Sequence, residues 1–287
     1  MTQTRGFVLN ASGDVFLRMA IKLARSLRTH CPDVEIDLFT DAATDDAAFT
    51  RVHVDPGFAG QGKIPAMRAS RFDRSIYMDV DMMAVADLRD VFDVLDAFDW
   101  AMCHDPWRNS GHAIRTWRQP LPPAFPQFNG GLIAWKRSPD TDEFLKKWQG
   151  AVADHGMGTD QPALRELMWL DRTLRVAILP EEYNLWDLRR IDGMTYRDRA
   201  PRVLHNNFLK RPRVLDAEVD TLQVLLGHRR LAQLKMLLAT DVSLKDPDDP
   251  SRQVDVRPSR FARLALAAQG LRDIPRHVRT VIRRPYL

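Results

Sequence analysis

The pattern of apolar and polar residues at the start of the chain predicts alternating strands and helices. Residues 5–12 (RGFVLNAS) predict a strand that runs into a turn of small residues. Residues 14–30 predict a helix, because their apolar side chains from Phe16 to Leu27 recur at helical spacing. Residues 34–41 (VEIDLFTD) alternate apolar and polar positions, which predicts a second strand. A strand, a crossover helix and a second strand indicate a parallel sheet.

The rest of the chain continues this alternation up to about residue 240. Strands are predicted at 75–81, 100–105, 131–136, 174–180 and from 202 onward, and helices at 66–72, 87–98, 141–155, 159–170 and 215–239. Residues 105–128 combine prolines, Trp107, Trp117 and polar groups without a period, which predicts a long functional or ordered loop. We therefore expect an α/β domain over residues 1–240, a polar linker over 241–256 and a basic tail over 257–287.

Composition narrows the class of protein. A chain of 287 residues with 45% hydrophobic residues can bury a substantial core. Cys31 and Cys103 belong to no CxxC or zinc-type cluster, which indicates neither a disulfide framework nor a structural zinc site and fits a reducing cytoplasm. The first residues lack the pattern of a secretory signal, and no segment approaches the roughly 18 apolar residues that a membrane span needs. We expect a soluble or peripheral cytoplasmic protein.

The positive charge of the chain is concentrated at its C-terminal end. The net charge is +4, but residues 257–287 hold eight arginines, no lysine and one acidic residue. This tail therefore carries +7, and the remaining residues together carry −3. A mildly acidic body without a basic stripe argues against a nucleic-acid partner.

Two aspartates interrupt an apolar run, IYMDVDMMAV, where unpaired charge is costly. In an extended chain alternate side chains point the same way, so Asp79 and Asp81 would face one side of a strand. Two like charges so close are tolerable if a cation lies between them or if one is protonated, and oxygen ligands suit Mg²⁺ or Mn²⁺. The pattern predicts a metal site at the carboxyl end of a strand, where open α/β sheets bind ligands.

The chain provides its own comparison for this DxD pattern. DxD recurs at Asp140–Asp142 and at Asp246–Asp248, but both of these lie in polar segments beside proline and need no partner. The apolar surroundings of Asp79 and Asp81, rather than the spacing alone, therefore carry the inference. The alternative is that the strand frays here and that both acids are solvated in a turn.

The run FDRSIYMDVDMMAVADL resembles the DxD segment of nucleotide-sugar glycosyltransferases with the GT-A fold, especially the retaining family 8 type that includes lipopolysaccharide galactosyltransferases and glycogenin. Further segments resemble that family in the same order: FNGGLIAWKRS, TDQPAL, LPEEYN and HNNFLK. Together they cover most of residues 5–212. The resemblance implies a Rossmann-like GT-A domain, with a mixed, mainly parallel sheet flanked by helices.

The resemblance also implies roles for individual residues. A divalent ion, Mn²⁺ or Mg²⁺, would be held by Asp79, Asp81 and His205 against the diphosphate of a UDP-sugar. The nucleotide and its phosphates would be contacted by Asn10, Ala11, Asp41, Lys63, Asp79 and Lys210. The donor sugar and its reacting carbon would lie near Asn129, Gly130, Asp160 and Gln161, with Gly130 and Gly131 allowing close approach of the backbone. Asp160 and Gln161 are the candidate catalytic residues.

Several of these residues have simpler explanations. Asp160 would serve equally well as a helix cap, because Pro162 follows in the first turn. Asn129 could be a turn residue with the two glycines forming a bulge, and Tyr183 and Asn184 could simply pack in a loop. The segment HNNFLKRP also lacks the glycine and the Lys-Pro-Trp ending usual in the family, which affects the placement of Lys210.

The reaction implied is metal-dependent transfer of a hexose to a glycan or lipid-linked acceptor, with retention at the anomeric carbon. We expect front-face attack within an ion pair, because the sequence presents no well-placed nucleophile. A haloacid-dehalogenase-like phosphatase would instead use Asp79 as nucleophile and Asp81 as acid/base. A sugar-nucleotide-binding protein without catalysis is the non-enzymatic alternative.

Apolar residues of the tail fall at helical spacing among arginines, at Phe261, Leu264, Ala265, Ala268 and Leu271. Such a segment could lie on an anionic membrane surface, which would suit a lipid-linked acceptor at the inner face of the membrane. A solvated helix that packs on its own domain explains the pattern equally well.

Overall fold

A computed structural model describes residues 3–58, 62–155, 159–217, 221–246 and 248. The chain divides into two compact units. Unit 1 consists of Met1–Asp187 and Pro201–Arg211, and unit 2 consists of Leu188–Ala200 and Pro212–Leu287. The predicted tail over 257–287 and most of the predicted linker lie outside the described residues.

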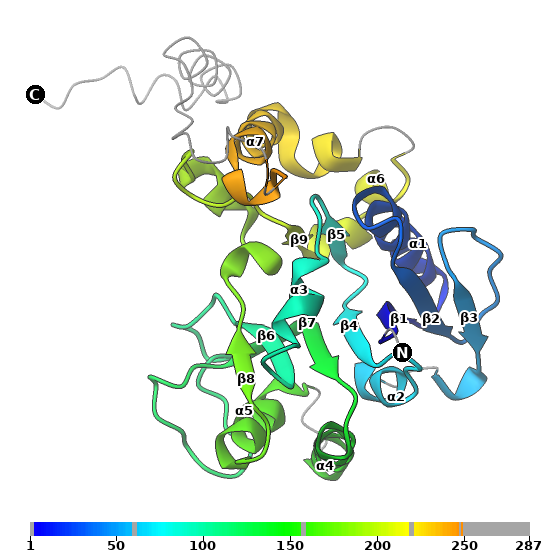
Figure 1. The fold of residues 1–287 in the computed structure, drawn as a ribbon, viewed down its shortest axis with the longest axis vertical. Helices are drawn as coiled ribbons and strands as arrows, with labels where there is room; N and C mark the ends of the chain where they lie inside the picture. The colour runs from blue at the N-terminus through cyan, green and yellow to red at the C-terminus, as the bar shows by residue number, and fades with distance from the viewer. Residues whose placement is uncertain (1–2, 59–61, 156–158, 218–220, 247, 249–287) are drawn as a thin grey trace, which may run out of the picture. The chain divides into compact units, whose positions relative to one another are not determined.

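Unit 1 is built on a seven-stranded sheet in the order β3-β2-β1-β4-β7-β6-β8 (Figure 1). The strands are β1 (Arg5–Ala11), β2 (Glu35–Thr40), β3 (Arg51–Val54), β4 (Arg74–Met78), β6 (Trp100–His104), β7 (Phe128–Lys136) and β8 (Val176–Ile178). Only β7 runs antiparallel to its neighbours, and every other adjacent pair is parallel. The predicted mixed, mainly parallel sheet is confirmed.

Helices cover both faces of this sheet. The first face carries α1 (Asp14–His30) and α3 (Asp90–Val94), and the second carries α2 (Lys63–Arg68), α4 (Pro139–His155) and α5 (Gln161–Leu170). Successive side chains of β1 point to opposite faces of the sheet, so neighbouring residues pack against different helices. Phe7 meets Phe92 of α3 at 5.6 Å between ring centroids, whereas Val8 joins the apolar cluster beneath α2, α4 and α5.

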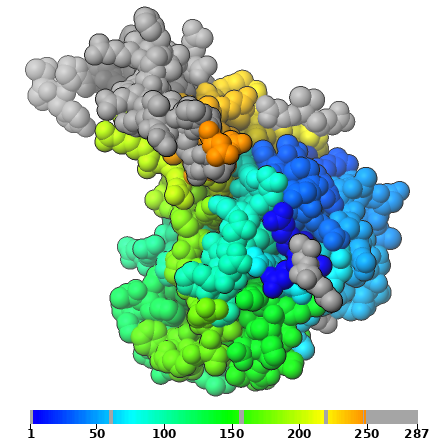
Figure 2. Space-filling view, viewed as in Figure 1, coloured from blue at the N-terminus to red at the C-terminus, as the bar shows by residue number. Residues whose placement is uncertain are grey.

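The apolar cluster on the second face is centred on large aromatic side chains. Trp100 of β6 lies edge-on to Phe144 and Trp148 of α4, with centroids 5.3 and 6.5 Å away. All three side chains are fully buried, and burial of each such group contributes roughly 1.5–3 kcal/mol. In the space-filling view the blue and cyan first half of unit 1 packs directly against its green portion (Figure 2). This packing fixes the sheet edge at which the polar residues gather.

A second, two-stranded sheet in unit 1 pairs β5 (Met82–Ala84) antiparallel with β9 (Val203–His205). In its register Met82 lies opposite His205. The described residues of unit 1 also form three short 3₁₀ helices: η1 (Pro56–Phe58), η2 (Glu181–Tyr183) and η4 (Asn207–Lys210). The β5–β9 pairing brings a late segment of the chain beside the DxD motif.

The described residues of unit 2 form η3 (Leu188–Gly193), α6 (Pro212–Leu215), α7 (Thr221–Thr240) and η5 (Val242–Leu244). The helix predicted at 215–239 is broken at Gly227, which has a φ of +71° that favours glycine. Arg230 of α7 forms an ion pair with Asp192 of η3 at 2.8 Å, and Asp241 accepts a hydrogen bond from the backbone N–H of Ala200 at 2.8 Å.

Most predicted elements are present, with shifted ends. The strand predicted at 75–81 ends at Met78, the helix predicted at 66–72 spans residues 63–68, and the strand predicted from 131 begins at Phe128. The short strands β3 and β5 were not predicted. Both cysteines are free and buried. Among the described residues, no helix is long and apolar enough to cross a membrane.

Candidate active site

The candidate site lies where the strand order reverses. From β1 the chain proceeds outward to β2 and β3, then returns to form β4 on the other side of β1. Crevices at the carboxyl ends of such strands are the usual ligand sites of open α/β sheets. Here a cavity of about 380 Å³ is lined by Asn10, Ser12, Phe16, Lys63, Asp79 and Asp81, among others.

The DxD motif lies in the turn between β4 and β5. The expectation that both aspartates point from one extended strand is therefore wrong in its local detail, because β4 ends at Met78. The turn is nevertheless held in place: the backbone N–H of Asp79 donates to the carbonyl of Gly131 at 2.7 Å, and that of Asn206 donates to the carbonyl of Asp81 at 2.9 Å. These carboxylates are about a quarter exposed and have close polar partners, so they are not freely solvated acids.

His205 meets the two aspartates because β9 pairs with β5. One ligand atom from each of Asp79, Asp81 and His205 lies within 4.8 Å of the others. His205 Nε2 is 3.2 Å from Asp81 Oδ1. Burial alone would raise the pKa of Asp81, but the hydrogen bond and charge of His205 outweigh it, so the pKa is lowered. Two carboxylates with one imidazole nitrogen form a donor set that fits a divalent ion such as Mn²⁺ or Mg²⁺.

Lys63 bridges the DxD motif and the start of α5. Its Nζ atom lies 3.4 Å from Asp79 and 3.4 Å from Asp160, and it donates to the carbonyl of Gly130 at 2.8 Å. Burial opposes the charge of Lys63, but Asp160 and Asp79 together raise its pKa, so the ammonium persists. A Cβ atom on Gly130 would lie 2.9 Å from Nζ. The glycine therefore makes room for this lysine.

The two candidate catalytic residues stand at the start of α5. Asp160 occupies the N-cap position, yet its side chain makes no capping hydrogen bond and points to Lys63 instead. The explanation of Asp160 as a plain helix cap is thus wrong. The indole N–H of Trp148 donates to its carbonyl at 3.0 Å and fixes the backbone there. Gln161 Oε1 lies 2.7 Å from Nε2 of His112, which belongs to the long loop 105–128.

Of the predicted nucleotide-binding residues, only some line the cavity. Asn10 lines it and donates to the carbonyl of Phe39 at 3.3 Å. Ala11 is buried at the end of β1. Asp41 accepts from the backbone N–H of Gly13 at 2.9 Å, which braces the turn before α1. Lys210 is exposed in η4 and does not line the cavity.

The predicted sugar-side residue Asn129 lies inside β7 rather than in a turn, so the turn explanation is wrong. The bulge expected at Gly130 and Gly131 agrees with the pairing of β7 with β6, whose register shifts between Phe128 and Ile133. Its Oδ1 atom accepts from the backbone N–H of Gly131 at 2.9 Å and from Nδ2 of Asn184 at 2.8 Å. Asn184 in turn contacts His205 Nδ1 at 2.8 Å. The structure thus joins the segments FNGG, LPEEYN and HNNFLK in one buried polar network.

Sequence reasoning missed several residues of this site. Phe16 was assigned to the apolar stripe of α1, but it is 50% exposed and lines the cavity. Tyr77 donates to Asp79 Oδ1 at 2.8 Å, and burial beside that carboxylate raises its pKa, so the hydroxyl keeps its proton. Ser12 and His112 also lie at the site. The alternation of β4 could have identified Tyr77, because it lies two residues before Asp79.

Comparison with known proteins agrees with this fold. Residues 74–213, just under half of the chain, match the family model of nucleotide-diphospho-sugar transferases. This segment contains the DxD motif, Asn129, Asp160 and His205. No curated protein matches the chain.

Solved structures of similar fold are glycosyltransferases. Galactosyltransferase LgtC, in complex with donor and acceptor sugar analogues, has a TM-score of 0.53 at 13% identity, over 86% of this chain and 99% of that one. Glycosyltransferase GlyE of Streptococcus pneumoniae TIGR4 has a TM-score of 0.54 at 13% identity, over 86% of this chain and 66% of that one. The bifunctional glycosyltransferase WbbM has a TM-score of 0.51 at 12% identity, over 82% of this chain and 52% of that one. At such low identity these similarities establish the fold, which is GT-A.

The fold is GT-A, and residues 74–213, which contain Asp79, Asp81 and His205, are similar to nucleotide-diphospho-sugar transferases. The fold resembles that of the galactosyltransferase LgtC.

Proposed function

We propose that this chain transfers a hexose from a UDP-sugar to a glycan or lipid-linked acceptor, with retention at the anomeric carbon and with Mn²⁺ or Mg²⁺ bound. One observation supports this function above all. Asp79, Asp81 and His205 come from segments far apart in the sequence, and their ligand atoms lie within 4.8 Å of one another at the switch point of the sheet.

Asp79, Asp81 and His205 would hold the metal ion, and when bound it would neutralise the negative charge that develops on the leaving diphosphate. Other residues would contact the nucleotide directly. Asn10 and the backbone at Ala11 would contact the nucleoside, with Asp41 bracing the turn behind them. Lys63 and Lys210 are the proposed phosphate-binding cations.

Asn129, Gly130, Asp160 and Gln161 would surround the donor sugar. Lys63 lies 3.4 Å from Asp160 and fixes its carboxylate, which can accept hydrogen bonds from sugar hydroxyls. The side chain of Gln161 would be oriented by His112 and lie near the reacting carbon. In a front-face reaction the acceptor hydroxyl approaches from the side on which the diphosphate departs, and the departing phosphate oxygen takes the acceptor proton.

A mainly apolar cavity of about 200 Å³, lined largely by residues of loop 105–128, is the proposed acceptor site. Asp105, Arg165 and Gln127 contribute to its lining. The amide of Gln127 is 99% buried, and neither of its polar atoms has a hydrogen-bond partner among the described residues. A buried amide without a partner costs free energy, so packing within the protein does not satisfy this part of the cavity wall.

The decisive experiment is calorimetric titration with UDP, with and without Mn²⁺. We expect binding that requires the metal and is abolished by Asp79→Asn with Asp81→Asn. The matched control is Asp140→Asn with Asp142→Asn, because these residues form a DxD whose side chains are exposed on α4. Absence of metal-dependent UDP binding, together with hydrolysis of p-nitrophenyl phosphate, would favour the phosphatase. UDP binding without transfer or hydrolysis of any UDP-hexose would favour a binding protein.

The stereochemical outcome requires a separate measurement. Once a UDP-hexose donor is found, proton NMR of the first product formed should show the same anomeric configuration as the donor. An inverted product would overturn the proposed front-face reaction and leave the transferase function intact.

The cytoplasmic location and the membrane contact through residues 257–287 remain proposals from the sequence. Vesicle sedimentation would test the latter. We expect the full chain to bind vesicles with 30% phosphatidylserine more strongly than neutral vesicles, and a chain that ends at residue 256 to lose the difference.

A further inference from the structure

We propose that Asn184 is a positioning residue that fixes the ring nitrogen His205 presents to the metal. This inference rests on the proposed metal-binding role of His205. It concerns a residue outside the predicted ligand set, and it follows from the direction of the hydrogen bonds in the buried network.

The backbone places Asn184 beside His205. The N–H of Leu185 donates to the carbonyl of Val203 at 3.0 Å, and the N–H of His205 donates to the carbonyl of Leu185 at 2.9 Å. This parallel bridge aligns the end of the LPEEYN segment with β9. The side chains of Asn184 and His205 are therefore neighbours, and both residues are only 3% exposed.

Packing confines the imidazole ring on two further sides. Trp186 meets it edge-on, with ring centroids 4.1 Å apart and planes at 83°. On another side lies Gly131, where a Cβ atom would come within 2.5 Å of His205 Cε1 and 2.6 Å of the Met82 methyl. The ring therefore fits against bare backbone.

The backbone N–H of Gly131 determines which atom donates and which accepts in each hydrogen bond of the network. The N–H of Gly131 can only donate, so the Asn129 atom at 2.9 Å must be its carbonyl oxygen. Asn184 approaches the same oxygen at 2.8 Å and must therefore do so with its NH₂ group. The oxygen of Asn184 is then the atom 2.8 Å from His205 Nδ1, and this nitrogen must carry a proton.

The consequence is that Nε2 is the atom directed at the acidic pair, 3.2 Å from Asp81. With Nδ1 committed to Asn184, the neutral ring offers its lone pair on Nε2, which is the form a metal ligand needs. Loss of such an outer partner typically lowers metal affinity about 10–100-fold. Asn184 thus links the sugar-side residue Asn129 to the metal-side residue His205.

The first test examines the metal-free protein by ¹⁵N NMR of the histidine rings at pH 9.5, with His205 assigned by comparison with His205→Gln. Every chain compared, including the one with wild-type Asn184, carries Asp81→Ala, because the Asp81 carboxylate 3.2 Å from Nε2 would otherwise compete for the ring proton. We expect the Nδ1–H tautomer in the chain with wild-type Asn184 and in Asn184→Asp, whose carboxylate still accepts from Nδ1. Asn184→Leu should shift the ring toward the Nε2–H form. If Asn184→Leu does not fold, Asn184→Ser takes its place. The proposal is overturned if the ring beside wild-type Asn184 is the Nε2–H tautomer, or if removing the acceptor leaves the tautomer unchanged.

The second test measures Mn²⁺ affinity in the presence of UDP by the EPR signal of free Mn²⁺. Asn184→Leu should weaken Mn²⁺ binding about 10–100-fold, with kcat at saturating Mn²⁺ changed much less than the Mn²⁺ requirement. The matched control is Asn207→Leu, an exposed residue two positions from His205. Equal Mn²⁺ affinity in Asn184→Leu and the wild type would overturn the positioning role. A wild-type chain that binds no Mn²⁺ would instead overturn the proposed function, while the tautomer measurement would still test Asn184.

Discussion

Phe16 is a large apolar residue that folding leaves exposed at the site. Its ring is half exposed at the start of α1 and lines the donor cavity. Stacking of a base on an aromatic ring contributes about 1–3 kcal/mol, so Phe16→Ala should weaken UDP binding roughly 5–150-fold. Titration with UDP and Mn²⁺ measures this. Phe98→Ala is the control, because Phe98 is 37% exposed and is not among the cavity residues; a similar loss in both variants would contradict a stacking role.

Lys63 lies between the carboxylates of Asp79 and Asp160 and forms an ion pair with each. Without its charge, Asp79 and Asp160 would face each other without the cation that now lies 3.4 Å from each. Charged hydrogen bonds contribute about 1.5–3 kcal/mol, so Lys63→Gln should lower kcat/KM roughly 10–150-fold, measured as release of UDP from the donor. Lys146→Gln removes an exposed lysine of α4 and should leave this rate unchanged. Equal rates in the two variants would show that Lys63 does not support turnover.

The sequence identified single residues by their chemistry, but it did not identify the residues that contact them. Asp79 and Asp81 were identifiable because charge inside an apolar run is costly, and the structure places His205 beside them. The pairing of Lys63 with Asp160 could not be predicted, because the two residues lie far apart in the sequence and nothing local links them. The exposure of Phe16 was missed because periodicity identifies the apolar face of a helix. It does not show which residues along that face other elements leave uncovered.

At the scale of elements, the glycines of β7 leave room for side chains from other elements: Lys63 lies against Gly130 and His205 against Gly131. A Cβ atom on Gly131 would lie 2.5 Å from His205, so Gly131→Ala should displace the ring and abolish metal-dependent UDP binding. Calorimetric titration measures the loss. The control is Gly150→Ala within α4, where a Cβ atom meets nothing within 4 Å. That change should leave UDP binding intact and raise the thermal midpoint, because alanine favours a helix by about 1 kcal/mol over glycine.

Intact UDP binding in Gly131→Ala would contradict the close contact between β7 and His205. The two variants carry the same chemical change, so unequal binding cannot be attributed to the alanine itself.

Elements were predictable where their amphipathic pattern was long. The 17 residues of α1 coincide with the predicted helix, whereas the strands β3 and β5 were missed. Four-residue β3 has no fully buried position, and three-residue β5 is buried throughout, so neither shows the alternation that signals a strand. The five-residue helix α3 is shorter than predicted, because its amphipathic pattern continues into turns that are not helical.

For the whole molecule, topology rather than local pattern determines where the site forms. The succession of strands and helices predicted a parallel sheet, and such a sheet places its ligands at the carboxyl ends of its strands. The pairing of β5 with β9 joins residues more than 100 positions apart, and only the folded chain reveals this contact. His205 was therefore added to the predicted Asp79 and Asp81 site only from a resemblance in the order of motifs, and the geometry of the three residues became available only from the structure.

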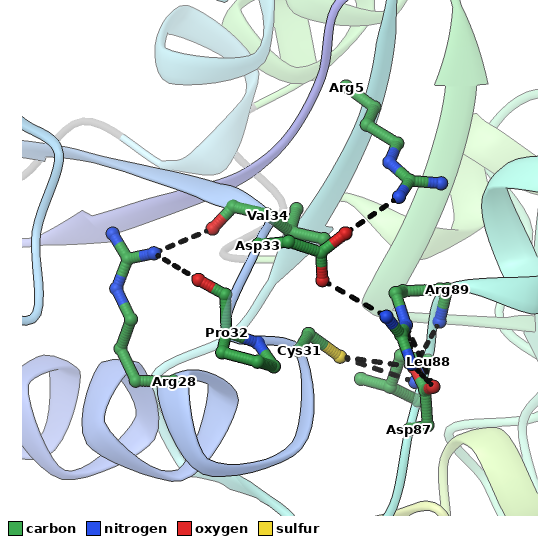
Figure 3. A network of polar contacts seen from close by, with 9 residues as sticks. All are labelled: Arg5, Arg28, Cys31, Pro32, Asp33, Val34, Asp87, Leu88 and Arg89. Atoms are coloured by element: carbon green, nitrogen blue, oxygen red, sulfur yellow. Dashed lines mark hydrogen bonds and ion pairs between the residues drawn. The ribbon is translucent and has the colours of Figure 1, made fainter.

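The polar contacts around Cys31 suggest how the stability of the molecule should depend on pH (Figure 3). Arg5 and Arg89 both bond Asp33, Arg89 also bonds Asp87, and the thiol of Cys31 lies 3.4 Å from Asp87. Burial alone would raise the pKa of Asp87, but its hydrogen bonds with Arg89 outweigh burial and lower the pKa below 3.8. The pKa of Asp33 is also lowered, because the arginines and a backbone N–H outweigh its slight burial.

A carboxyl whose pKa is lowered by folding binds its proton more readily in the unfolded chain. Its contribution to stability is therefore complete above the ordinary pKa near 3.8 and is lost as the pH falls through the lower, folded value. The free energy of unfolding, from urea titrations at pH 7, 5, 4 and 3, should be nearly constant down to pH 5 and fall below pH 4. Asp87→Asn should be less stable at pH 7 and lose less stability between pH 5 and pH 3, because one of the linked protons is gone. Asp140→Asn, at an exposed position, should follow the wild type. If Asp87→Asn instead lost as much stability with acid as the wild type, Asp87 would not contribute to the acid sensitivity of the fold.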